Sequence, residues 1–303
     1  MPFSEMYGQL LGRKSRFMFI SLNPGTLSFS VALEEALRLA KENNFAALDL
    51  PLKEIWQLVQ ESSIQEVKER FDAAGVRPGG WGLPVDFRGS EENYQEGLAT
   101  LPGSAALAQA LGSPWCATWI LPFSDELDYS ANMELHSRRL RPVAQILADY
   151  GCRFGLEFVG PRTMREGHKY GFIATMDEAL ELGHSLGTGN TGLLLDCWHW
   201  YTSHGTVKDL ERLTADQVVY VHVNDAPAGR AIDEQIDNQR LLPGASGVID
   251  IASFLQALVR MGYDGPVVVE PFDASLQALA PEERVRLTRE SLSKIWAQAG
   301  LKE

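Results

Sequence analysis

Short runs of apolar and β-branched residues recur along the chain, and longer segments with a helical repeat of apolar positions separate them. Eight such runs lie at residues 17–22, 45–50, 76–83, 115–121, 153–159, 191–196, 218–223 and 266–270. Amphipathic helix patterns between them include residues 31–42, 64–74, 135–150, 177–186, 250–261 and 281–299. This alternation predicts βαβ units and a parallel sheet.

The number of predicted strands points to a closed sheet. Eight strands, each followed by a helix, predict a (β/α)₈ TIM barrel of the α/β class. A doubly wound open sheet is the alternative, but it usually has fewer strands and would leave edge strands exposed. The 303 residues suffice for two ordinary domains, yet single barrels reach this length. Because no Pro-, Gly- or Ser-rich linker divides the chain, we expect residues 1–303 to form one barrel domain.

Charge and composition narrow the classes of partner and compartment. A formal net charge of -13 argues against nucleic acid and anionic membranes as partners, since both require clustered Lys and Arg. Cys116, Cys152 and Cys197 form no C-x-x-C pair, which predicts small core residues in a reducing compartment. Residues 1–15 lack a signal-peptide core, and no run approaches the ~20 apolar residues of a membrane span. We therefore expect a cytoplasmic protein.

Polar side chains lie at the ends of the last four apolar runs, where barrel enzymes carry their catalytic groups. They are Glu157, Asp196, His222 and Glu270. A single carboxylate at a strand end is more often an N-cap or a salt-bridge partner, and a lone strand histidine is more often a core residue. Four consecutive strands that end this way would surround one pocket, where three carboxylates repel one another unless a cation neutralises them.

These four side chains form a ligand set for one divalent ion. Carboxylate oxygens with a single imidazole suit Mn²⁺, Mg²⁺, Co²⁺ or Zn²⁺. The set contains no thiolate ligand, which would have been the strongest reason to prefer zinc. We therefore expect Glu157, Asp196, His222 and Glu270 to bind a divalent metal ion whose identity the residues leave open.

Three further residues are candidates for substrate binding. His199 follows Asp196 by three positions and would face the same pocket, unless it is a surface residue of the aromatic stretch 198–201. Arg240 lies in the long connection at residues 225–248 and would either bind substrate oxygen atoms or pin the loop through Asp237. Asp225, which begins this loop, is the third candidate.

Aromatic residues near the predicted strand ends allow two interpretations. Trp81, Trp115, Trp119 and the stretch 198–201 would form an apolar wall on which a sugar-like ring stacks, or they are core packing.

Glu157, the Asp196-x-x-His199 pair, His222 and Glu270 resemble the metal ligands and accompanying histidine of the xylose-isomerase-like barrel superfamily. This superfamily includes ketose 3-epimerases, hydroxypyruvate isomerase, inosose dehydratase and the endonuclease IV type of DNA-repair enzyme. The C-terminal half is most similar to the 2-keto-myo-inositol (inosose) isomerases, in the motifs His222-x-x-Asp225-Ala226, Asp237-x-x-Arg240-x-x-Pro243-Gly244 and Gly247-x-Ile249-Asp250. The N-terminal half matches only in its strand and helix pattern.

The nuclease branch of this superfamily is disfavoured by the histidines. Its trinuclear zinc site resembles one that takes histidines from the second and third strands and from an Asp-x-His motif in the seventh loop. In this chain the first histidine is His136, and the seventh loop reads Asn238-Gln239-Arg240.

The residues and the resemblance together predict a divalent-metal-dependent isomerase or epimerase that acts on a keto-inositol or a ketose. A metal bound to the carbonyl and hydroxyl oxygens would stabilise the enediolate, while Glu157 and Glu270 take and deliver the proton. One alternative is an inosose dehydratase, in which the same enediolate expels a β-hydroxyl. Another is a barrel that binds a polyol without catalysis. The expected partner is a small polyhydroxy-ketone, and the oligomeric state, a homo-oligomer included, stays open.

Overall fold

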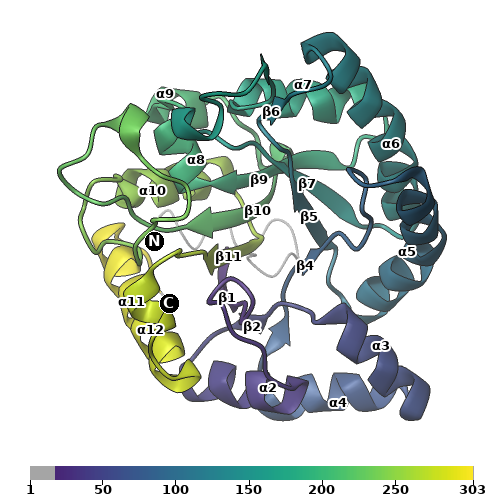
Figure 1. Ribbon diagram of the computed structural model, residues 1–303. Coiled ribbons are helices and arrows are strands. Elements are labelled where there is room, and N and C mark those ends of the chain that lie inside the picture. Colours follow the sequence, from purple (N-terminus) through teal and green to yellow (C-terminus); the bar gives the residue numbers. More distant parts are fainter. Residues whose placement is uncertain (1–17, 303) are drawn as a thin grey trace, which may run out of the picture.

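A ring of short parallel strands lies at the centre of the computed structural model, which describes residues 18–302 (Figure 1). The strand order is β3-β2-β1-β11-β10-β9-β7-β5-β4. The strands are β1 (Phe19–Leu22), β2 (Ala47–Leu48), β3 (Arg77–Pro78), β4 (Trp81–Gly82), β5 (Trp115–Trp119), β7 (Arg153–Glu157), β9 (Thr191–Asp196), β10 (Val218–Val223) and β11 (Pro266–Val269). Phe17 and the expected absence of a signal peptide in residues 1–15 lie outside the described residues.

The sheet closes through the third predicted strand. Its two halves, β3 and β4, are separated only by Gly79 and Gly80, and they pair with β2 and β5 respectively. A Cβ on Gly79 would collide with the Ser21 hydroxyl, and one on Gly80 would collide with the Tyr220 ring. Glycine therefore lets the backbone approach the barrel interior at this break. Counting β3 and β4 as one strand gives the predicted eight, and the TIM-barrel prediction is confirmed.

Helices surround the sheet on its outer side (Figure 1). They are α2 (Leu33–Glu42), α3 (Leu52–Glu61), α4 (Ile64–Ala74), α5 (Glu91–Leu111), α6 (Tyr129–Asp149), α7 (Met176–Leu186), α8 (Cys197–Thr202), α9 (Val207–Leu210), α10 (Ile251–Met261), α11 (Ala274–Gln277) and α12 (Pro281–Gln298). The six helices named from the sequence are all present, and most of their ends agree within two residues. The sequence patterns did not single out α3 and α5. The interior position of Pro102 in α5 explains part of this, since proline usually ends a helix.

Apolar side chains fill the barrel interior up to the carboxyl ends of the strands. This inner cluster comprises Phe19, Ala47, Trp115, Ala117, Leu194, Val219, Tyr220 and Val268. A larger cluster fills the layer between the strands and the helices. The three cysteines are buried and unpaired, as the prediction of small core residues required. The filled interior leaves the carboxyl ends of the strands as the place for a site.

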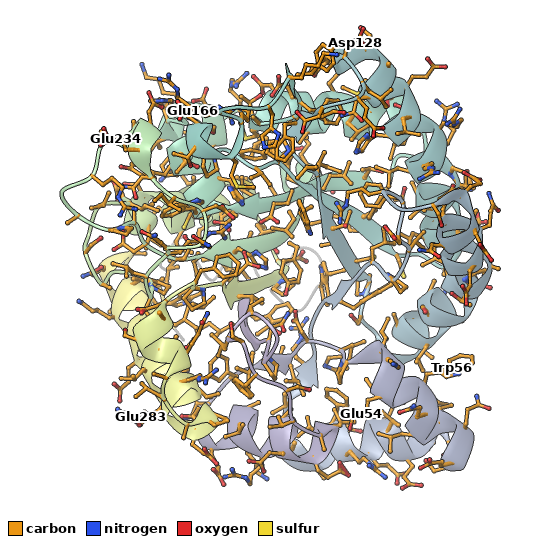
Figure 2. All side chains as sticks on the ribbon, viewed as in Figure 1. Glu54, Trp56, Asp128, Glu166, Glu234 and Glu283 are labelled. Carbon is orange, nitrogen blue, oxygen red and sulfur yellow. The ribbon has the colours of Figure 1, made fainter. Side chains whose placement is uncertain are left out.

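Charged side chains cover the outside of the molecule. Figure 2 shows Asp128, Glu166, Glu234 and Glu283 at its periphery, consistent with the acidic net charge. Among the described residues, none of the helices has both the length and the apolar character needed to cross a membrane.

Candidate metal centre

Four polar side chains from neighbouring strands converge at the carboxyl ends of β7, β9, β10 and β11. Glu157 ends β7, Asp196 ends β9, His222 lies opposite Asp196 on β10, and Glu270 directly follows β11. Each residue offers one ligand atom, and these atoms all lie within 4.8 Å of one another. The strand ends thus bring together the four residues that the sequence predicted as metal ligands.

The cluster contains buried atoms that lack a hydrogen-bond partner. The His222 Nδ1 atom lies 3.4 Å from Glu157 Oε1, 3.4 Å from Glu270 Oε2 and 3.9 Å from Asp196 Oδ2. Among the described residues, Glu157 Oε1 and His222 Nδ1 form no hydrogen bond. Leaving such atoms unpaired costs about 1–3 kcal/mol each, and a cation between them would satisfy both. Three carboxylates and an imidazole therefore fit a divalent metal ion.

The surroundings push the acidities of the two glutamates in opposite directions. Burial raises the pKa of Glu157 to about 7. Burial also opposes ionisation of Glu270, but the charges of His222 and Arg240 and the hydrogen bond from Arg240 lower its pKa to about 2. Burial would lower the pKa of His222, yet Glu270 and Glu157 together raise it well above its usual value. In the metal-free protein the site thus holds one carboxyl group whose pKa lies near neutral pH and one whose pKa is lowered.

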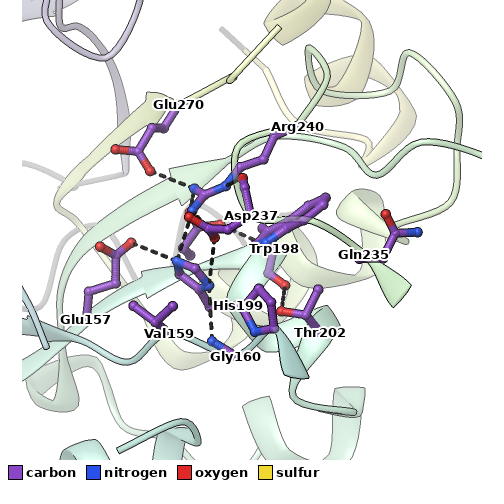
Figure 3. A network of polar contacts seen from close by, with 12 residues as sticks. Glu157, Val159, Gly160, Trp198, His199, Thr202, Gln235, Asp237, Arg240 and Glu270 are labelled. Atoms are coloured by element: carbon purple, nitrogen blue, oxygen red, sulfur yellow. Dashed lines mark hydrogen bonds and ion pairs between the residues drawn. The ribbon is translucent and has the colours of Figure 1, made fainter. Parts of the chain in front are cut away.

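Arg240 lies among the candidate ligands (Figure 3) and is only 2% exposed. Its Nη1 donates to Asp196 Oδ2 at 2.8 Å and to Glu270 Oε2 at 2.7 Å. Its Nε donates to the Asp237 carbonyl, and its Nη2 donates to the Asp237 carboxylate and contacts His199 Nε2. Four of the five N–H donors therefore have oxygen acceptors, and the fifth faces His199 Nε2, which carries the proton of the neutral imidazole because Nδ1 accepts the Gly160 N–H. This geometry supports the alternative that Arg240 pins its loop through Asp237.

His199 is buried beside the cluster in the first turn of α8, so the surface alternative is wrong for this residue. Its Nδ1 accepts the main-chain N–H of Gly160 at 3.2 Å, and its Nε2 lies 3.9 Å from Glu157 Oε1. Burial first, and then the charge of Arg240, lowers its pKa well below the usual value. His199 is therefore a neutral imidazole at the edge of the site, and its contact with substrate stays a prediction.

Asp225 organises the seventh loop, which corrects its assignment as a substrate ligand. Its Oδ1 accepts the N–H groups of Ala226 and Ile249, and its Oδ2 accepts those of Ser246 and Gly247, at 2.7–3.0 Å. A carboxylate has about four lone-pair positions, and all of them are used here. The side chain is fully buried and has no capacity left for a ligand.

Sequence reasoning missed Asn224 as a member of the site. Its Nδ2 donates to Asp196 Oδ1 at 3.1 Å and lies 3.3 Å from Oδ2, and Asp196 Oδ1 also accepts the N–H of Trp198. These donors fix the orientation of the Asp196 carboxylate. Asn224 lies two positions after His222, and the two-residue repeat of a strand would have placed it on the same inward face.

The expected aromatic wall is reduced to one residue. Trp115 begins β5 and packs at the opposite end of the barrel against Phe19, because the strand runs from Trp115 to Trp119. Trp81 and Trp198 are buried. Trp119 alone of these tryptophans is exposed, at 42%, and it pairs in register with Glu157 at the carboxyl end of β5.

The chain is similar to several known proteins. The inosose isomerase of Halalkalibacterium halodurans is 24% identical over 283 residues, which cover 92% of this chain and 96% of that protein. The 3-dehydroshikimate dehydratase of Pseudomonas aeruginosa is 30% identical over 141 residues, 46% of this chain and 21% of that protein. A xylose isomerase domain protein from Alicyclobacillus acidocaldarius superimposes with a TM-score of 0.84 at 33% identity, covering 93% of this chain and 99% of that one.

A second solved structure, the IolI protein with a bound zinc atom, has a TM-score of 0.76 at 20% identity and covers 93% of this chain and 99% of that one. Residues 37–295 of the present chain match the sequence profile of the xylose isomerase-like TIM barrel family. The resemblance inferred from the strand-end residues is thereby confirmed, and the chain belongs to the xylose isomerase-like TIM barrel family.

Proposed function

We propose that this protein is a divalent-metal-dependent isomerase or epimerase acting on a keto-inositol or a ketose. One observation carries the proposal. Two carboxylates at the ends of separate strands, buried Glu157 and half-buried Glu270, flank the same His222 nitrogen at 3.4 Å, and in the metal-free protein their pKa values are displaced in opposite directions. Pairs of carboxyl groups separated in this way serve as the acid and the base of an enzyme.

The proposed reaction requires proton transfer beside a ketone. A divalent ion held by Glu157, Asp196, His222 and Glu270 would act as a Lewis acid on the carbonyl and hydroxyl oxygens of the substrate. Ionised Glu270 is suited to remove the proton from the carbon next to the carbonyl. Glu157, on the separate strand β7, is suited to deliver a proton to the adjacent carbon or to the opposite face. The two carboxyl groups come from the ends of different strands, β7 and β11, so the proton need not return to its original position.

Two features support an inosose or ketose as the substrate. The seventh-loop motifs from His222 to Asp250 resemble those of inosose isomerases. Two relatives that align with more than 90% of this chain are also named inosose isomerases. Trp119 adds an exposed ring at the mouth of the barrel, where a sugar-like ring would stack.

A dehydratase is the second candidate, because a 3-dehydroshikimate dehydratase is among the relatives. Removal of the same proton would then expel a β-hydroxyl group as water. A polyol-binding protein without activity is the least supported alternative, since binding alone does not need two carboxyl groups of opposed acidity at the site.

A metal-supplemented substrate screen tests the proposal. The purified protein is analysed for bound metals, stripped with a chelator, reloaded with Mn²⁺, Mg²⁺, Co²⁺ or Zn²⁺ and incubated with inososes, ketoses and hydroxypyruvate. We expect a product of unchanged mass that depends on the added metal. Loss of water from the product would establish the dehydratase instead, and activity that is unaffected by metal removal would contradict the proposal.

A further inference from the structure

The connection after β4, residues 83–90, is firmly held at the mouth of the barrel. It follows the carboxyl end of the third predicted strand, so it lies on the same face of the barrel as the candidate metal ligands. Arg139 of α6 donates from Nη1 to the carbonyls of Phe87 at 2.9 Å and of Gly89 at 2.8 Å. These bonds fix the backbone on both sides of Arg88, whose side chain is exposed. Such bracing suits a loop that presents one side chain in a fixed position.

Two aromatic rings lie against the guanidinium of Arg88. Its central carbon is 4.1 Å from the centroid of the Trp119 ring and 4.6 Å from that of the Phe87 ring. Its Nη1 also donates to the Trp119 carbonyl. A guanidinium stacks on aromatic rings through its flat faces, so the N–H groups in its plane stay available.

The positive charge of Arg88 has no anionic partner within the described part of the chain. There, no carboxylate forms an ion pair with it, and the Trp119 carbonyl is its one hydrogen-bond acceptor. Asp86 of the same loop instead accepts the N–H of Gly89 at 2.9 Å. Arginine has five N–H donors, and four of them are therefore free for a ligand. A stacked guanidinium with free donors in its plane is suited to bind a carboxylate or a phosphate.

The distance of Arg88 from the metal centre is set by Trp119. This residue pairs in register with Glu157, one strand spacing of about 5 Å away. The two-residue repeat of β5 places Trp119 on the same inward side as Trp115 and Ala117, which belong to the inner cluster. A ligand held at the metal that extends toward β5 therefore reaches Trp119 and the guanidinium stacked on it.

We propose that Arg88 is a specificity-determining residue, which binds a carboxylate or a phosphate on the part of the substrate that lies away from the metal. The preferred substrate is then a ketose that carries a negative charge, in place of an uncharged sugar or inosose. This inference rests on the proposed function, because it names the substrate class of the same site.

Calorimetric titration of the full-length protein in the presence of Mn²⁺ tests the inference without requiring turnover. The ligands are fructose, fructose 6-phosphate and fructuronate, which carry a hydroxyl, a phosphate and a carboxylate at the same terminal carbon. We expect at least one of the charged ketoses to bind roughly 10–100-fold more tightly than fructose, the usual effect of hydrogen bonds between charged groups. The charged ketose that binds more tightly identifies the group as a phosphate or a carboxylate.

Variants of Arg88 show whether this residue causes the preference. Arg88→Met should weaken binding of the charged ketose to about the level of fructose and leave the affinity for fructose unchanged. Arg88→Lys keeps the charge without the planar fork and should retain part of the preference. Arg138→Met is the matched control, since it removes the same charge from an exposed position on α6, and it should keep the full preference.

Equal affinity of the wild type for all three ketoses overturns the inference. An equal loss of affinity for fructose and for the charged ketose in Arg88→Met also overturns it, because that result marks a structural role. If Arg88→Met does not fold, Arg88→Gln repeats the test. Conversion of uncharged substrates without tighter binding of the charged ones would refute this inference alone. A protein that binds a charged ketose through Arg88, but converts no inosose or ketose with any added metal, would refute the proposed function alone.

Discussion

Glu157 is a buried carboxylate whose charge should destabilise the metal-free protein. Its pKa is raised from an ordinary value of 4.5 to about 7, and its exposed fraction is only 6%. The folded state therefore holds a proton that the unfolded state releases, and stability falls as the pH rises from about 4.5 to about 7. A displacement of this size corresponds to ~3 kcal/mol. Replacement by the neutral, similarly sized Gln removes this penalty.

We expect the metal-free Glu157→Gln protein to exceed the wild type in free energy of unfolding by about 3 kcal/mol at pH 8 and by less than about 1 kcal/mol at pH 5. Urea denaturation in the presence of a chelator, followed by tryptophan fluorescence, measures both values. Glu234→Gln, at an exposed carboxylate in the seventh loop, should leave the stability unchanged at both pH values. A gap that does not widen between pH 5 and pH 8, or a destabilised Glu157→Gln protein, would refute this reasoning.

Three further predictions concern the site and its support. Glu270→Gln should abolish turnover while the fold and the metal occupancy are retained; near wild-type activity in a metal-loaded variant would exclude the two-carboxylate scheme. Binding of Mn²⁺ to the metal-free protein should release about two protons near pH 6, from His222 and Glu157, so that the affinity rises with pH. Calorimetry in buffers of different ionisation enthalpy measures this release, and a binding heat that is the same in every buffer would contradict it. Gly80→Ala should cost about 1–3 kcal/mol, since its Cβ collides with the Tyr220 ring, whereas Gly82→Ala, with open space around its Cβ, should be neutral in urea denaturation.

The strands and the four strand-end residues could be predicted because their pattern is local. Val267, Val268 and Val269 are consecutive β-branched residues, which is enough to predict a buried strand. In a parallel barrel the residue that follows such a strand lies at the carboxyl end, where the site forms, and here it is Glu270. Glu157 and His222 became candidates because a buried charge or imidazole needs a partner. Each of these arguments requires only the sequence and the barrel topology.

The contacts of Arg240 with Asp196 and Glu270, and the role of Asp225, could not be predicted, because they depend on how an irregular loop folds back. A sequence shows that a long loop carries an arginine, but not that its guanidinium donates to Asp196, Glu270 and Asp237 together. Likewise, the four amides that saturate Asp225 are separated from it by up to 24 positions. Trp115 was misplaced for a simpler reason: the strand direction puts its first residue at the opposite end of the barrel from its last.

The fate of the proton beside the ketone tests the central claim most directly. The metal-loaded protein is incubated in D₂O with an inosose or a ketose, and the recovered product is examined by mass spectrometry. A proton-transfer isomerase or epimerase with exchangeable carboxyl groups should give an isomer that carries deuterium on the carbon next to the carbonyl and retains all its oxygen atoms. Deuterium incorporation should vanish in Glu270→Gln and in the metal-free protein. A product that has lost water, or no exchange by the metal-loaded protein with any of these substrates, would contradict the account.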